Sequence, residues 1–156
     1  MIKESVKYLK DKYKETNKRF LGIDFGTVNI GLAISDVSRT IASPYKTLKN
    51  KSYSLLFKEF DEIINEMDIG AVIIGLPLQM NGEEGDTATK VRNFKTELEN
   101  RFSNIDILLS DERLTSSISE KMLIREFDLS RQKRKQVIDK LSASYILQNV
   151  LDSINL

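Results

Sequence analysis

Residues 20–35, FLGIDFGTVNIGLAIS, contain two short apolar segments separated by a polar turn. The first six residues predict a buried strand, the next four a tight turn, and the last six a second strand. A third apolar segment, residues 41–48, contains Pro44 and fits an edge strand, because proline lacks the N–H that a sheet ladder needs. We expect these three strands to form an antiparallel meander.

Helical and strand patterns alternate in the rest of the chain, which predicts an α/β fold with a five-stranded mixed sheet flanked by helices. Helical crossovers make the fourth and fifth strands parallel to their neighbours. The basic segment at residues 131–135 reads as a turn. The elements expected after the meander are a helix from residue 52, a strand at 71–74, a helix over 91–102, a strand at 105–109, a helix from 117 and a final helix from about 137.

The first 18 residues predict an additional amphipathic helix, because Ile2, Val6, Leu9 and Tyr13 recur at helical spacing among charged residues. We expect residues 1–18 to form a helical extension and residues 19–156 to form one domain. The pattern does not distinguish a helix that docks on this domain from one that reaches a partner, and docking is the simpler expectation.

The composition restricts the chemistry available to the chain. Its 156 residues are 40% hydrophobic, which is enough for one compact core, and the formal net charge is +1. The absence of histidine and cysteine excludes Ser-His-Asp triads, thiolate nucleophiles and zinc sites built from these residues. Any catalysis must use carboxylates, hydroxyls, lysine or arginine, together with a cation that prefers oxygen ligands. Neither a membrane span nor a secretory signal is present in the sequence, so a cytoplasmic protein is expected.

Carboxylates follow two of the predicted strands. Asp24 closes the first strand, Asp111 and Glu112 close the fifth, and Asp139 begins the apolar stripe of the last helix. If the first and fifth strands are parallel, their carboxyl ends meet at one edge of the sheet. Each acid alone fits an ordinary turn, cap or helix-dipole role. Burying an unpaired carboxylate is costly, and the convergence of three favours a shared divalent cation.

Candidate phosphate-binding groups lie near these acids in the sequence. Gly26 and Thr27 follow Asp24 in a turn whose backbone N–H groups could contact a phosphate, although an ordinary hairpin turn explains them equally well. Arg113 follows the acidic pair. Basic runs are usually solvated surfaces, but one beside the acids would bind a polyanion backbone. The densest run consists of Arg131, Lys133, Arg134 and Lys135.

Four motifs together resemble the YqgF family of RNase H-like nucleases, which are related in fold to RuvC-type Holliday junction resolvases. The resemblance extends from about residue 20 to 151. It implies an RNase H-like five-stranded sheet and a nuclease that matures the 5′ end of pre-16S rRNA. The motifs are FLGIDFGT at residues 20–27 with IGLA at 30–33, VIIGLPLQMNG at 72–82 with EG at 84–85, DERLT at 111–115 and IDKLSA at 138–143.

The resemblance also implies site residues. By motif position, Asp24, Glu112 and Asp139 are the catalytic acids and hold Mg²⁺ or Mn²⁺. The sequence departs from the family pattern at Val28-Asn29, where a Lys-Arg pair is common, and this weakens the phosphate contact expected there. Gln79 and Asn81 replace a commoner Asn and Asp, and residues 1–18 have no counterpart in the family core.

The leading hypothesis is a divalent-metal-dependent phosphodiesterase acting on precursor rRNA in ribosome biogenesis. Asp111 and Gly26 would support the metal-binding acids, while Thr27, Arg113 and the basic run would contact nucleic acid. One alternative is a Holliday junction resolvase acting on DNA as a dimer, and the sequence leaves monomer and homodimer open. A second is a non-catalytic RNA-binding assembly factor. A sugar-kinase or actin-like nucleotide-binding protein is disfavoured, because such proteins need two of these domains.

Overall fold

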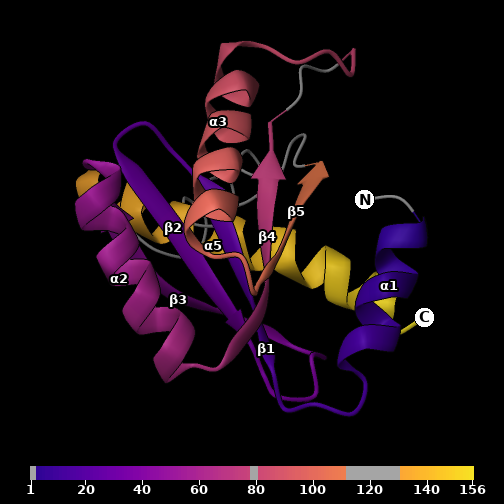
Figure 1. Ribbon diagram of the computed structural model, residues 1–156. Helices are drawn as coiled ribbons and strands as arrows, with labels where there is room; N and C mark the ends of the chain where they lie inside the picture. Colours follow the sequence, from indigo (N-terminus) through magenta and orange to yellow (C-terminus); the bar gives the residue numbers. More distant parts are fainter. Residues whose placement is uncertain (1–2, 78–80, 112–130) are drawn as a thin grey trace.

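The computed structural model describes residues 3–77, 81–111 and 131–156, and it shows a twisted five-stranded sheet with helices against both faces (Figure 1). The strand order is β3-β2-β1-β4-β5. The strands are β1 (Arg19–Phe25), β2 (Asn29–Ser35), β3 (Ala42–Lys49), β4 (Ile69–Leu76) and β5 (Asp106–Asp111), and the helices are α1 (Lys3–Tyr13), α2 (Tyr53–Glu66), α3 (Asp86–Arg101) and α5 (Arg131–Ile154).

The strand pairing confirms the predicted mixed sheet. The pairs β1–β2 and β2–β3 are antiparallel, whereas β1–β4 and β4–β5 are parallel. Pro44 lies in β3, an edge strand, as expected. Every residue of β4 is buried, which explains its unbroken apolar sequence, since helices cover both of its faces. The carboxyl ends of β1, β4 and β5 therefore share one edge of the sheet.

The final helix begins earlier than the sequence predicted. Residues 131–135 form the first turns of α5, so their interpretation as a turn was wrong. This basic segment contains only Arg, Lys and Gln, which favour helices, and it has no Gly or Pro to interrupt the pattern. The helix predicted from residue 117 lies outside the described residues. Within the described part of the chain, no helix is both long and apolar enough to cross a bilayer.

Two hydrophobic clusters hold the layers together. One lies between the sheet and helices α2 and α3, and it includes Phe57, Phe60 and Phe94. The other lies on the opposite face, where α5 and α1 cover residues of β1, β2 and β4, including Phe20 and Ile73. The sheet is thus the middle layer, and α5 is the main cover of one side.

Helix α1 docks on the domain. Leu9 and Tyr13 are only 0% and 5% exposed, and both belong to the cluster beneath α5. At the end of α1, the buried guanidinium of Arg39 donates hydrogen bonds to the backbone carbonyls of Tyr13, Thr16 and Lys18. Arg39 therefore links the extension to the β2–β3 hairpin.

A second attachment of α1 is Asp106, the first residue of β5. Its carboxylate accepts hydrogen bonds from Tyr8 (3.0 Å), Lys12 (2.8 Å) and Tyr13 (2.5 Å). Partial burial opposes ionisation of Asp106, but these three donors outweigh it and hold the pKa of this carboxyl below its usual value. Burial and the bond to Asp106 raise the pKa of the Tyr13 phenol, which stays a donor.

We expect this cluster to make stability depend on acid pH. A carboxyl whose pKa is lowered on folding stabilises the fold above its unfolded pKa of about 4, and this contribution is lost as the pH falls through the lower folded pKa. Between pH 5 and pH 3 the free energy of unfolding should therefore decrease more steeply in the wild type than in Asp106→Asn. Urea unfolding at a series of pH values measures both slopes. Asp68→Asn, which removes an exposed ion pair with Lys18, serves as the control; a wild-type slope shared by Asp106→Asn would contradict the expectation.

Candidate active site

The Asp24 side chain faces helix α5. Asp24 is opposite Gly31 in the antiparallel β1–β2 pair, and residues that are directly opposite point to the same face of a sheet. Gly22, two residues earlier on β1, has the same orientation, and a Cβ atom there would lie 2.8 Å from the Ala143 carbonyl of α5. On this face of β1, Gly22 allows α5 to pack closely, and the half-exposed carboxylate of Asp24 lies next to that contact.

Asp139 lies on the same face of the sheet as Asp24, where α5 contacts Gly31 of β2. A Cβ atom at Gly31 would collide with the Asp139 backbone carbonyl, so the absence of a side chain at Gly31 permits this approach. The Asp139 side chain is half-buried, and its Oδ2 atom has almost no accessible surface. Because Gly31 is at once the strand partner of Asp24 and the contact of Asp139, the structure brings these two predicted acids to one face and one edge.

The same row of residues continues across the parallel strands. Ile23 of β1 pairs with Ile74 of β4, so the next residues along these parallel strands, Asp24 and Gly75, also lie side by side. Gly75 in turn pairs with Ser110 of β5. Gly75 places no side chain between them, and Ser110 is 7% exposed. Ser110 was not singled out from sequence. Its position directly before the acidic pair at the end of β5 was the available signal.

Asp111 lies at the same edge but on the other face of the sheet. It pairs with Leu76, which belongs to the cluster under α2 and α3, and its side chain is exposed. Glu112 and Arg113 follow it and lie outside the described residues. Among the described residues, no group of three acidic side chains forms a metal site. The third predicted acid, Glu112, lies outside the described residues.

The turn after Asp24 is held by Asn50. The Asn50 side-chain amide donates to the Gly26 carbonyl at 2.7 Å, and its backbone N–H donates to the Val28 carbonyl at 2.8 Å. Thr27 is exposed at the tip of the turn. Asn29 is 7% exposed, and its Oδ1 atom has no hydrogen-bond partner among the described residues. Sequence analysis treated Asn29 only as a departure from a family pattern and missed this buried acceptor on the face that Asp24 shares.

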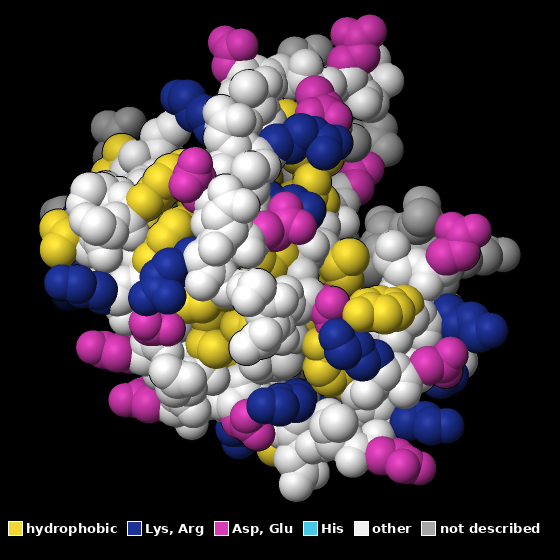
Figure 2. All heavy atoms as spheres, in the orientation of Figure 1, with side chains coloured by type: hydrophobic (Ala, Val, Ile, Leu, Met, Phe, Trp, Pro, Cys, Tyr) yellow, Lys and Arg dark blue, Asp and Glu magenta, His cyan; other side chains and the backbone are white. Residues whose placement is uncertain are grey.

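The predicted basic residues belong to the first turns of α5. Arg131, Lys133, Arg134 and Lys135 precede Asp139 on the same helix, and the Lys133 side chain is exposed. On the face shown in Figure 2, lysine, arginine and acidic side chains are interspersed rather than gathered into a basic surface. Because the net charge is only +1, a nucleic acid would have to be attracted by individual lysine and arginine side chains close to the acids.

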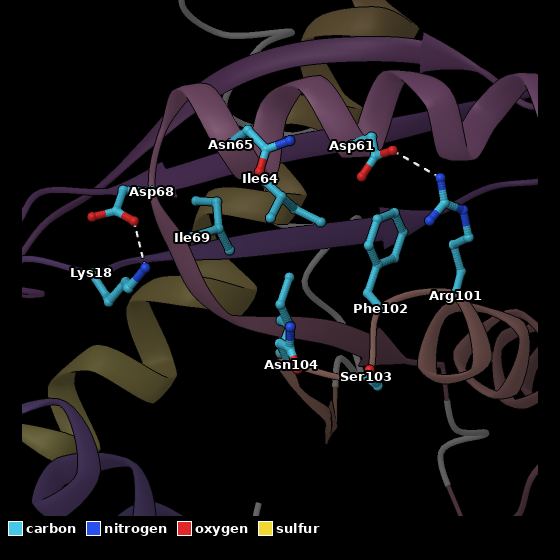
Figure 3. A pocket seen from close by; sticks show the side chains of 11 residues that line it. Lys18, Asp61, Ile64, Asn65, Asp68, Ile69, Arg101, Phe102, Ser103 and Asn104 are labelled. Carbon is cyan, nitrogen blue, oxygen red and sulfur yellow. Dashed lines mark hydrogen bonds and ion pairs between the residues drawn. The ribbon is translucent and has the colours of Figure 1, made fainter.

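A separate cavity of about 370 Å³ lies at the opposite end of the strands (Figure 3). Its walls come from residues that precede or begin β1, β4 and β5, from α2 and from the end of α3, and none of the predicted site residues lines it. Its two cations are already paired, Lys18 with Asp68 at 2.5 Å and Arg101 with Asp61 at 2.8 Å. This cavity therefore offers neither the predicted acids nor an uncompensated charge for a phosphate.

The sheet order, the acid at the end of the first strand and the acid on the last helix define an RNase H-like domain of the resolvase type. RuvC of T. thermophilus in complex with a Holliday junction substrate has the same fold, with a TM-score of 0.54 over 88% of this chain and 96% of that one, at 10% identity. The family model described as "RuvX: Holliday junction resolvase" matches residues 18–153. The chain belongs to this family.

Curated relatives support the same assignment. The chain is 49% identical over 135 residues to a protein of Thermoanaerobacter pseudethanolicus, covering 86% of this chain and 96% of the relative. It is 45% identical over 134 residues to a protein of Endomicrobium trichonymphae, covering 86% and 95%. Both relatives carry the name "Putative pre-16S rRNA nuclease". The resemblance inferred from the four sequence motifs is thus confirmed.

Proposed function

We propose that this chain is a divalent-metal-dependent endonuclease that hydrolyses phosphodiester bonds, with precursor rRNA as its substrate. The observation that supports the proposal is the placement of Asp24 and Asp139 on one face of the sheet, at the edge where β1, β4 and β5 end. The names of the relatives favour a precursor-rRNA substrate, which would place the protein in the cytoplasm and in ribosome biogenesis.

The donor set fits a hard cation. Asp24 and Asp139 offer carboxylate oxygens, and Glu112, which follows β5, is the third acid that we assign to the site. Mg²⁺ and Mn²⁺ prefer such ligands, whereas the softer nitrogen and sulfur ligands of zinc sites are absent from the sequence. When bound, such a cation lowers the pKa of a water molecule and stabilises the charge that develops during hydrolysis.

The remaining groups of the chain would position the substrate. Thr27 and the backbone N–H groups of the Gly26 turn would contact a phosphate, and the hydrogen bonds from Asn50 keep this turn in place before substrate arrives. Arg113 and the basic residues at the start of α5 would hold the strand on either side of the scissile bond. With no histidine, protons from the attacking water would pass to a carboxylate or to solvent.

We propose that the nuclease domain comprises residues 19–156 and that residues 1–18 are an extension. Two observations support this division. The family match begins at residue 18, and α1 contributes its apolar face to the domain without supplying any residue of the candidate site.

A cleavage panel tests the proposed function. The substrates are a precursor rRNA fragment containing the 5′ end of the mature 16S sequence, an unstructured single strand and a four-way DNA junction, each with Mg²⁺, Mn²⁺ or EDTA. We expect cleavage of the precursor with either metal and none with EDTA. Unchanged cleavage in EDTA would refute metal dependence, and binding without cleavage under every condition would support an RNA-binding assembly factor instead.

The description of the matched family favours a second candidate, a dimeric Holliday junction resolvase. A resolvase must cut two strands symmetrically, which requires a two-fold dimer. Symmetric junction cleavage by a protein that elutes as a dimer in size-exclusion chromatography would establish this function. A monomer that cleaves only RNA would exclude it.

A further inference from the structure

A second hollow, of about 250 Å³, opens beside the candidate active site on the opposite face of the sheet. It lies between the turn after β1, the start of α2 and the first half of α3. In Figure 2, hydrophobic side chains reach the surface in the region between these two helices. The residues that line it are Phe25, Thr27, Asn50, Tyr53, Lys90 and Asn93.

This pocket adjoins the candidate site through the backbone. Asp24 and Phe25 are consecutive residues of β1, so their side chains point to opposite faces while their Cα atoms are only about 3.8 Å apart. Thr27 lies in the turn that joins β1 to β2, and Asn50 both lines the pocket and binds the Gly26 carbonyl. A strand that crosses this edge of the sheet would pass from the pocket to Asp24.

The aromatic wall of the pocket is fixed by its neighbours. The Phe25 ring lies 4.5 Å from the Phe94 ring, and the Tyr53 ring stacks on Phe57 with centroids 5.3 Å apart and an interplanar angle of 2°. Burial and the nearby Glu97 raise the pKa of the Tyr53 phenol, which therefore stays neutral. The Tyr53 ring is part-exposed and is available for stacking without first having to be ordered, whereas Phe25 is 8% exposed and supports it from within.

Three polar side chains of the pocket are uncommitted, whereas Asn50 binds the Gly26 carbonyl. The side chains of Thr27, Lys90 and Asn93 form no hydrogen bond or ion pair with other described residues. The cavity in Figure 3 differs in this respect, because both of its cations are neutralised by aspartates. Lys90 thus gives the smaller pocket a positive charge, and Thr27 and Asn93 add groups that can bind the edge of a base or a sugar hydroxyl.

We propose that this pocket holds one unpaired nucleotide of the substrate strand, next to the phosphate presented to Asp24. The inference rests on the proposed nuclease function and adds a substrate class to it, namely strands with an unpaired base beside the cleavage point. The pocket is smaller than the roughly 300–1,000 Å³ of drug-sized ligand sites, so it suits a single base. A base reaches such a pocket only when it is out of the duplex stack.

Binding measurements in EDTA test the pocket separately from cleavage. We would titrate the wild type, Tyr53→Leu and Lys90→Gln with a fluorescent single-stranded RNA, the same sequence as single-stranded DNA, and a blunt RNA duplex. Tyr45→Leu in β3 and Lys58→Gln in α2 are matched controls outside the pocket. Urea unfolding of each variant verifies that it is folded, and Lys90→Gln changes only an exposed side chain.

We expect Tyr53→Leu to weaken single-strand affinity by about 10- to 100-fold, which is the effect of losing one stacked base. Lys90→Gln should make the slope of log affinity against log salt concentration shallower, by about the contribution of one phosphate contact. Duplex affinity should be unchanged in both, and a stronger loss for RNA than for DNA would identify a contact to the sugar hydroxyl. Single-strand binding that both variants retain at wild-type strength, or no single-strand binding by the wild type, would overturn the proposal. These binding measurements do not require the proposed metal-binding acids. A failure of the nuclease function would therefore be detected separately, in the cleavage panel.

Discussion

Asp24→Asn is expected to lower the rate of cleavage by about 1,000-fold or more while leaving substrate affinity and folding nearly unchanged. The amide is close in size to the carboxylate but carries no charge, so it would bind a divalent cation poorly. A loss of this size corresponds to about 4 kcal/mol of transition-state stabilisation, which is within the range that a catalytic metal supplies. Single-turnover cleavage of the precursor fragment with saturating protein measures it without interference from product release.

The matched control is Asp111→Asn. Asp111 lies at the same edge of the sheet, but its side chain is on the other face and exposed. We expect the control to lose less than about 10-fold in rate. Full activity of Asp24→Asn would show that the proposed site is not where hydrolysis occurs, whereas equal losses in the two variants would point to a general effect of charge at this edge.

Gly31→Ala should destabilise the protein by about 3 kcal/mol or more and also reduce cleavage. The added Cβ would collide with the Asp139 carbonyl, which is backbone and cannot move without shifting α5. Overpacking in a well-packed core commonly costs about 1–3 kcal/mol, and a clash with backbone belongs at the upper end. Urea unfolding gives the stability, and the cleavage assay under conditions where the variant is still folded gives the activity.

Ser43→Thr is the control for this substitution. It also adds one methyl group to the sheet, but at an exposed position on the edge strand β3. We expect its stability to change by less than about 0.5 kcal/mol. If Gly31→Ala were as stable and as active as this control, the close approach of α5 to β2 would not be what positions Asp139.

The arrangement of strands was predictable because local and long-range signals agreed. The apolar segments around residues 20–35 contain the turn residues that a hairpin needs, and the unbroken apolar run in β4 indicated burial on both faces. The start of α5 was not predictable in the same way. A dense run of positive charge resembles a loop in composition, yet each of its residues is a good helix former.

The candidate site was predictable in part. Asp24 and Asp139 were identified from their positions at a strand end and at the head of an apolar stripe, and the structure places both on one face. Which face they share depends on Gly22 and Gly31, whose role is visible only when the helix lies against them. Ser110 and Asn29 were missed because a buried serine or asparagine has no characteristic spacing in a sequence.

The attachment of the N-terminal helix has a practical consequence for anyone who shortens the protein to the part shared with its relatives. Arg39 donates to the carbonyls of Tyr13, Thr16 and Lys18, which precede β1, and to the carbonyl of Val37 in its own hairpin. A chain beginning at residue 19 would keep the guanidinium and only the last of these acceptors. Water would replace the lost carbonyls, but the truncation would also uncover the apolar residues that Leu9 and Tyr13 bury. A minimal version of this nuclease therefore requires polar replacements for the apolar residues that the truncation would expose to solvent.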